Sequence, residues 1–421
     1  MTRGINRRQV LELFRVGAAA WGARALIGPR PARAATRPRP RFYLQVIPQG
    51  GMDAVYTTDP KKPGEVDRGI DLGAGDMVEH ASGTRLGPSF RALARWIPQL
   101  AIVNAFRQNS ANHVSGLAHV TRFKSSTAES APTLLDVLGA RRDREATGAI
   151  SIGGGFPTAF SPRFLGAPSE AVFGARPGLF EHLDGADPDD LRAVARALRR
   201  EAEPLRGARA SAAEQVTADN LLVSAELLSR VATVPRFAPV AWAHPLEADY
   251  HDGRDLQRAL WLFEHGLARC AMVCVGNQDF DTHLWNTTIQ PQMAEYLAFL
   301  LDKLFSELEV RRVDDRPLSQ QTVVIIGSEI GRFPRLNAAH GKDHFPQTPH
   351  LFYGPGLATG ASYGGTGRDM ASVPISLATG RPEKGGHLLR IDDIGTTLLA
   401  LDGANPDLSG YTGEHLRFLT T

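Results

Sequence analysis

Short apolar segments alternate with longer amphipathic segments along most of the chain, and this alternation restricts the fold more than any other feature. The apolar runs have the length and composition of buried strands: residues 42–47, 100–106, 149–152, 271–275, 322–326 and 350–353. Other segments have helical periodicity: residues 187–203, 211–231, 255–267, 289–311 and 393–401. Strands that alternate with helices predict an α/β fold, with a parallel or mixed sheet covered by helices on both faces. A helical stretch at about 160–265 is expected to be an insertion or a cap on this domain.

Length and charge narrow the class of protein. The 421 residues suit one large domain or two to three smaller ones, and two cysteines, Cys270 and Cys274, exclude a disulfide framework. The net charge of +2 is misleading, because residues 1–34 contain seven arginines and a single acid, Glu12. The whole chain has 47 Lys+Arg and 45 Asp+Glu. Without residues 1–34 it has 40 basic and 44 acidic residues, a net charge of −4. Nucleic-acid binding therefore lacks the basic folded surface that it needs.

The N-terminal segment has the layout of a twin-arginine export signal. Arg7 and Arg8 precede a mildly apolar stretch over residues 16–28, and Ala32-Arg33-Ala34 follows as a small-x-small cleavage pattern. That order predicts recognition by the twin-arginine export machinery and a periplasmic or secreted protein. The apolar stretch is too short to span a bilayer, so no stable membrane anchor is expected. A basic, disordered tail is the alternative interpretation. The chain is therefore expected to divide into a signal (1–34), a linker (35–40) and one α/β domain (41–421).

Acidic, imidazole and hydroxyl side chains follow the predicted strands at the points where the strands end. Ligands of open α/β sheets bind at the carboxyl ends of the strands, and carboxylates and imidazoles are common ligands of divalent metals. Singly, each residue has an ordinary explanation as a turn residue, a helix cap or a solvated side chain. Their recurrence after successive strands predicts a metal site. In chain order they are Asp53; Asn112, His113, Ser115 and His119; Asp279, Asp281 and His283; Ser328 and Glu329; and His340, Asp343 and His344.

Several short motifs also carry a family resemblance: Gln49-Gly50-Gly51-Met52-Asp53, Asp279-Phe280-Asp281-Thr282-His283, Gly327-Ser328-Glu329-Ile330-Gly331-Arg332, Gly341-Lys342-Asp343-His344-Phe345-Pro346 and residues 360–366. Through them the chain resembles domain-of-unknown-function family 1501 over nearly its whole length, apart from roughly residues 155–260. That family is similar to the alkaline phosphatase superfamily, which includes sulfatases and phosphodiesterases. The resemblance implies an alkaline-phosphatase-like, mostly parallel sheet sandwiched by helices, with two metal ions and a hydroxyl nucleophile.

The resemblance implies metal-binding roles for individual residues. Asp53 matches the first-strand aspartate that binds one ion. Asp279 and His283 match an Asp-x-x-x-His pair that binds the other ion, whereas Asp281 and His283 are the signature pair within the narrower family, so both aspartates stay open. His344, 15 residues beyond Glu329, matches the last metal histidine. Glu329 and Asp343 complete the candidate metal ligands.

Two features depart from the superfamily pattern. Ser328-Glu329 stands where the superfamily has Asp-His, which exchanges an imidazole for a carboxylate and counts against a complete two-metal site. The nucleophile is open between Ser110 and Ser115, which lie where the superfamily places a hydroxyl residue at a helix start.

Further catalytic roles are expected of residues near these motifs. Asn112 is expected to donate to a non-bridging oxygen, and Arg332 to clamp an anionic group. His113 is expected to be a metal ligand or a general acid, and His119 a supporting or packing residue.

These residue types favour metal-assisted hydrolysis of a phosphate or sulfate ester, with a small-molecule or polymeric anionic ester as substrate. Zinc, manganese and calcium all suit donors drawn from Asp, Glu and His. The alternative is a catalytically degenerate exported member that binds an anionic glycan or a protein partner without turnover. The Ser-Glu replacement and the open nucleophile favour that alternative.

Overall fold

The computed structural model describes residues 39–73, 75–125, 132–141, 145–152, 186–207 and 210–421. The expected export signal, most of the linker and the 160–185 part of the expected insertion lie outside the described residues. Within them, no helix combines the length and hydropathy that crossing a bilayer requires.

A seven-stranded sheet in the order β13-β4-β12-β9-β1-β6-β5 forms the centre of the fold. β1 pairs in parallel with β6 and β9, while β12 runs antiparallel to both of its neighbours, β4 and β9. The predicted mixed, mostly parallel α/β sheet is therefore confirmed. The strands are β1 (Phe42–Pro48), β4 (Leu100–Arg107), β5 (Thr147–Ile152), β6 (Ala268–Val275), β9 (Thr322–Gly327), β12 (Gln347–Tyr353) and β13 (Ala361–Gly364).

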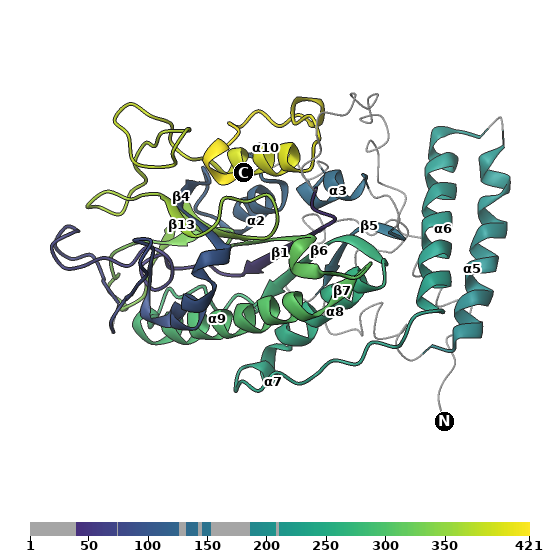
Figure 1. Cartoon of the computed structure of the whole chain (residues 1–421), viewed down its shortest axis with the longest axis horizontal. Helices are drawn as coiled ribbons and strands as arrows, with labels where there is room; N and C mark the ends of the chain where they lie inside the picture. The colour runs from purple at the N-terminus through teal and green to yellow at the C-terminus, as the bar shows by residue number, and fades with distance from the viewer. Residues whose placement is uncertain (1–38, 74, 126–131, 142–144, 153–185, 208–209) are drawn as a thin grey trace.

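Helices cover both faces of the sheet, as Figure 1 shows. Phe42, Leu44 and Val46 of β1 belong to a core cluster with α8 (Asp252–Glu264) and α9 (Asn286–Val310). Tyr43 and Ile47 belong to the second core cluster, on the other face. That cluster includes residues of α2 (His113–Arg122), α3 (Leu134–Gly139) and α10 (Ile391–Leu401). Every β1 residue is buried, which explains why this central parallel strand is apolar on both faces apart from Gln45.

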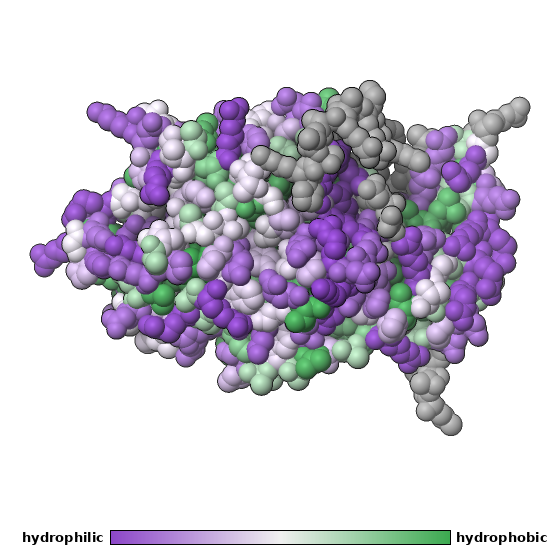
Figure 2. All heavy atoms as spheres, in the orientation of Figure 1, coloured by the Kyte–Doolittle hydropathy of each residue, from purple (hydrophilic) through white to green (hydrophobic). Residues whose placement is uncertain are grey.

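The helices α5 (Pro188–Ala202) and α6 (Ala212–Val231) form an antiparallel pair at one end of the molecule (Figure 1). Leu191, Ala195, Leu198 and Ala202 recur at helical spacing and are buried, while the charged positions of α5 face outward. The outer surface of the pair is accordingly mostly hydrophilic in Figure 2. α8 falls within the expected 160–265 insertion, yet it packs against β6 in the main layer.

The predicted strands and helices agree with the structure to within a few residues at each end. Cys270 and Cys274 are buried, unpaired residues of β6. Short or polar elements had no periodicity to reveal them. They include α7 (Glu247–Tyr250) and the strand pairs β2 (Val78–Glu79) with β3 (Arg85–Leu86), β7 (Arg312–Val313) with β8 (Arg316–Pro317), and β10 (Gly331–Arg332) with β11 (His344–Phe345). The 3-10 helix η2 (Pro88–Gln99) was not predicted, although one of its faces buries Phe90, Leu93, Trp96 and Ile97. Shorter 3-10 turns are η5 (Pro204–Arg206), η6 (Leu318–Gln320), η7 (Asp407–Ser409) and η8 (Arg417–Leu419).

Candidate metal centre

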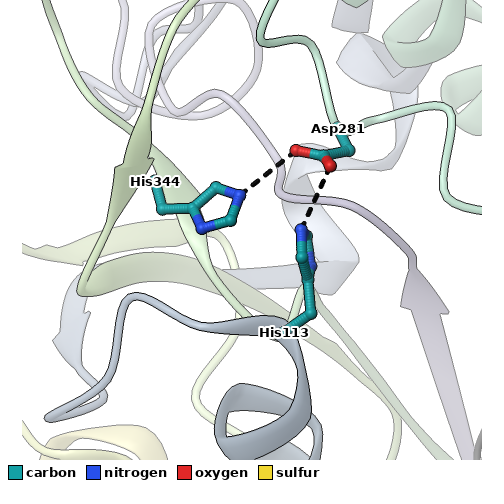
Figure 3. Close-up of side chains that lie close together, drawn as sticks. All are labelled: His113, Asp281 and His344. Carbon is teal, nitrogen blue, oxygen red and sulfur yellow. Dashed lines mark hydrogen bonds and ion pairs between the residues drawn. The ribbon is translucent and has the colours of Figure 1, made fainter.

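The Asp281 carboxylate, in the loop between β6 and α9, is surrounded by three imidazole rings. His283 Nε2 and His344 Nε2 each lie 3.3 Å from Asp281 Oδ1, and His113 Nε2 lies 3.2 Å from Oδ2. Figure 3 shows His113 and His344 pointing at this carboxylate from different elements of the fold. Ligand atoms of His113, Asp281 and His344 all lie within 4.8 Å of one another, which makes this group a candidate metal site.

Each imidazole is anchored through its other ring nitrogen. His344 Nδ1 donates to the Ala111 carbonyl at 2.7 Å, and His283 Nδ1 donates to Asp343 Oδ1 at 3.3 Å. These acceptors fix the protonated nitrogen of each neutral ring at Nδ1, so the lone pair is at Nε2. Metal-binding histidines have the same arrangement, with the free N–H on a carboxylate or a backbone carbonyl.

His283 Nε2 and His344 Nε2 are 2.8 Å apart. Two lone pairs at that distance repel each other unless a cation, either a proton or a metal ion, lies between them. The Asp281 oxygen at 3.3 Å from both nitrogens favours a metal ion. Atoms bound to zinc at tetrahedral angles are about 3.3 Å apart, because zinc–nitrogen bonds are about 2.0–2.1 Å long. Two edges of the triangle of Asp281, His283 and His344 match this spacing, and the third, at 2.8 Å, is shorter. The three side chains are therefore a candidate set of ligands for one ion.

Arg332 holds the Asp281 carboxylate in place. Its Nη2 donates to Asp281 Oδ1 and to the Gly50 carbonyl, and its Nη1 donates to the Lys342 carbonyl at 3.0 Å. Burial alone would raise the pKa of Asp281, but hydrogen bonds from His113 and Arg332 and their charges bring it well below its usual range. Because the Arg332 side chain has no exposed area, it positions Asp281 rather than reaching a substrate.

His113 bridges two carboxylates. Its Nδ1 is 2.8 Å from Glu329 Oε1, opposite its contact with Asp281. Hydrogen bonds to Asp281 and then Glu329 raise the pKa of His113 to about 9, against the desolvation that lowers it. Unlike the other two rings, His113 is thus stabilised as an imidazolium by the protein itself. Glu329 is buried and also accepts from Gly50 N at 2.8 Å and from the Ser328 hydroxyl at 2.8 Å, so it supports His113.

Local backbone geometry brings these segments together. Gly50, at φ +111°, lies so close to the 278–281 loop that a Cβ atom there would be 2.3 Å from Asp281 N. Arg332 of β10 pairs directly with His344 of β11. Asn337 Nδ2 donates to the His283 carbonyl at 3.1 Å and to Asp343 Oδ1 at 3.2 Å, which braces the histidine loop.

The two candidate nucleophiles lie together at the start of α2. Ser110 Oγ and Ser115 Oγ are 2.7 Å apart, and Ser110 Oγ accepts from Asn112 N at 3.1 Å. Asn112 is the N-cap of α2, because its Oδ1 accepts from Val114 N at 2.9 Å. This cap places His113 at the first residue of the helix.

Other candidates lie away from the Asp281 carboxylate. Asp279 is exposed and accepts a hydrogen bond from the Tyr250 hydroxyl, so the structure brings Asp281 rather than Asp279 to the histidines. His340 is exposed. His119 is buried within α2, where burial lowers its pKa.

Asp53 lies in a separate charged group with Lys342. Lys342 Nζ is 2.7 Å from Asp53 Oδ2 and 3.0 Å from Asp71 Oδ2. Sequence reasoning assigned no role to Lys342 or Asp71. Lys342 directly precedes the candidate ligands Asp343 and His344 in the chain, and this position was the only indication in the sequence that it belongs to the site. The sequence does not show that its side chain is buried.

Comparisons with known proteins place the chain among proteins without an assigned activity. The family model described as "Protein of unknown function (DUF1501)" matches residues 43–376. No curated protein matches the chain.

Solved structures that the chain matches include the lipoteichoic acid synthase LtaP from Listeria monocytogenes, with 9% identity and a TM-score of 0.41. That match covers 99% of this chain and 82% of the other chain. A protein in the alkaline phosphatase superfamily from Vibrio parahaemolyticus has 12% identity and a TM-score of 0.39, and the match covers 98% of this chain and 79% of that chain. The PsFucS1 sulfatase from Pseudoalteromonas sp. has 10% identity and a TM-score of 0.37, and the match covers 91% of this chain and 72% of that chain.

Proposed function

Because the chain belongs to the DUF1501 family of proteins of unknown function, we propose its activity from its own site: metal-dependent hydrolysis of phosphate or sulfate esters. The observation that carries this proposal is the convergence of His283 Nε2 and His344 Nε2 on Asp281 Oδ1, with each Nδ1 already engaged. These three side chains would hold one divalent ion with a position open to substrate. Catalytic metal sites differ from structural ones by that open position.

Zinc suits this donor set best. Two neutral imidazoles and one carboxylate are ligands typical of zinc or manganese, whereas calcium takes six to eight oxygen ligands. A bound ion of this kind would lower the pKa of a hydroxyl that it contacts and offset the charge of the ester oxygens.

The remaining residues have distinct roles in this proposal. Arg332 orients Asp281 from behind, and Asp343 orients His283. His113, held between Asp281 and Glu329, is the proposed general acid for the departing oxygen of the ester. Its Nε2 is buried against Asp281 Oδ2, so this proton transfer requires the ring to turn away from that carboxylate. Ser110 and Ser115 are the candidate nucleophiles, and the N-terminus of α2 favours negative charge developing on either oxygen.

The substrate would be an anionic ester, small or polymeric, and the site would work in the periplasm or outside the cell if the N-terminal segment directs twin-arginine export. Fusion of residues 1–40 to a reporter that folds in the cytoplasm tests the export proposal. Transport of the reporter should depend on Arg7 and Arg8, and retention of the unaltered fusion in the cytoplasm would contradict it.

Activity is tested by incubating the purified chain with Zn²⁺, Mn²⁺ or Ca²⁺ and with aryl phosphate, phosphate diester and aryl sulfate substrates. Turnover should require the metal, fall in His344→Gln, and persist in His80→Gln, which alters a half-buried turn histidine. Ser110→Ala and Ser115→Ala identify the nucleophile. A metal-loaded chain without turnover on any ester would contradict hydrolysis and support binding of an anionic partner.

A further inference from the structure

The carboxylates of Asp53 and Asp71 share one buried ammonium group. Lys342 Nζ lies 2.7 Å from Asp53 Oδ2 and 3.0 Å from Asp71 Oδ2, and the lysine side chain has no exposed area. Asp53 is 1% exposed, and the Asp71 side chain is 13% exposed. Charges buried this deeply persist in proteins when they are paired and hydrogen-bonded.

The other oxygen contacts of both aspartates are supplied by the protein as well. Asp53 Oδ1 accepts from Val55 N at 3.1 Å, and its Oδ2 accepts from Asn286 Nδ2 at 3.2 Å. Asp71 Oδ1 accepts from Gly73 N at 3.1 Å, and its Oδ2 accepts from the Tyr56 hydroxyl at 3.0 Å. The carboxylates thus have hydrogen-bond partners and a counter-charge without any bound ion.

These contacts do not fit a second metal ion at Asp53. A divalent cation bound to Asp53 Oδ2 would lie close to the Lys342 ammonium, and two like charges in a buried site repel strongly. The resemblance to the alkaline phosphatase superfamily implies two ions, with Asp53 binding one of them, and this chain departs from that pattern.

We infer that the centre holds a single divalent ion, and that the Lys342 ammonium takes the place of a second ion between Asp53 and Asp71. This inference rests on the proposed metal centre at Asp281. The backbone of Lys342 links the two groups, because its amide donates to the Thr282 carbonyl at 2.9 Å and its carbonyl accepts from Arg332 Nη1 at 3.0 Å. The lysine therefore supplies a charge that a chelator cannot remove, and it also braces the arginine that holds Asp281.

Metal stoichiometry tests this inference without reference to activity. Purified chain is saturated with Mn²⁺, freed of unbound ion, and analysed for metal per chain by mass spectrometry. We expect one ion in the wild type, one in Asp53→Asn and none in Asp281→Asn. Two ions in the wild type, one of them lost in Asp53→Asn, would overturn the inference while leaving the proposed function intact. No ion in the wild type would overturn both.

Removing the ammonium gives a second test. Lys342→Met keeps the length of the side chain but leaves two carboxylates without a counter-charge, so we expect it to bind a second Mn²⁺ and to gain more thermal stability from Mn²⁺ than the wild type does. Lys61→Met, which removes a lysine paired with Asp59, is the matched control and should stay at one ion. A folded Lys342→Met protein that stays at one ion contradicts the inference. If that variant does not fold, the numbers of metal ions per chain in the wild type and in Asp53→Asn still test the inference.

Discussion

His283 and His344 face each other through their Nε2 atoms at 2.8 Å, and each ring donates its Nδ1 proton to another acceptor. This contact is unfavourable between two neutral rings and favourable around a metal ion that also binds Asp281. A proton shared between the two Nε2 atoms would also relieve the repulsion, so metal affinity is the measurement that distinguishes a metal centre from a hydrogen-bonded pair of rings.

Replacing either ring with glutamine should weaken metal binding. Loss of an outer hydrogen-bond partner of a ligand typically costs about 10–100-fold in metal affinity, so loss of a ligand in His283→Gln or His344→Gln should cost at least about 100-fold. Competition with a chromophoric chelator measures the change. His80→Gln should keep wild-type affinity, and equal affinity in all three variants would rule out these rings as ligands.

Glu329 should control the protonation of His113 in the metal-free protein. Hydrogen bonds to Asp281 and Glu329 raise the pKa of His113 to about 9 because they favour the charged imidazolium. In Glu329→Gln one of these negative partners is neutral, so the pKa of His113 should fall towards its ordinary value of about 6.5. Nitrogen-15 NMR of the imidazole follows this titration. An unchanged His113 titration would show that Glu329 does not act on this ring.

Gly50 should tolerate no side chain. A Cβ atom at Gly50 would lie 2.3 Å from Asp281 N, and φ of +111° strains any L-residue. Gly83, at φ +81° with nothing within 4 Å of its Cβ position, shares the strain without the clash. We expect Gly83→Ala to lower the free energy of unfolding by about 1 kcal/mol and Gly50→Ala to lower it by more than about 3 kcal/mol.

Denaturant unfolding provides the comparison between these two variants. Metal affinity should fall in Gly50→Ala alone, because the clash displaces the Asp281 loop. Equal destabilisation of both proteins would contradict the close approach of the two loops.

His350 should make the protein sensitive to acid. It is fully buried in β12, with its ring centroid 5.4 Å from that of Phe106 and 5.9 Å from that of Phe123. Burial lowers its pKa to about 3. The unfolded chain binds the proton near pH 6.5 and the folded chain does not, so stability falls as the pH drops from about 6.5 towards 3.

This one group should lower the free energy of unfolding by about 2 kcal/mol between pH 7.5 and pH 5. His350→Phe keeps a ring of similar size and cannot titrate. The variant should therefore lose less stability than the wild type over that interval, measured by denaturant unfolding at each pH. Parallel pH dependences in the two proteins would show that His350 does not resist protonation.

Much of the fold follows from the sequence because burial dominates it. β1, β6 and β9 are mostly apolar and fully buried, since both faces of a central parallel sheet are covered. The amphipathic repeats of α5 and the long helix α9 were equally visible. Short pairs such as β10 with β11 were not, because a two-residue strand has no period, although this pair places Arg332 opposite His344.

The site was harder to predict than the fold. Of the polar residues that follow the strand ends, the structure brings together Asp281, His283, His344 and His113. The choice between Asp279 and Asp281 depends on the path of an irregular loop, which spacing alone does not determine. Sequence also does not reveal counter-charges: Glu329 supports an imidazole, and Asp53 is neutralised by Lys342, through contacts between segments far apart in the chain.

The most direct test of a single metal centre is a crystal structure of the zinc-loaded chain with anomalous data collected at the zinc edge. We predict one anomalous peak per chain, within bonding distance of an Asp281 oxygen, His283 Nε2 and His344 Nε2, and no peak between Asp53 and Asp71. The absence of a peak at Asp281, or a peak bound to Asp53 in the place of the Lys342 ammonium, would contradict the account.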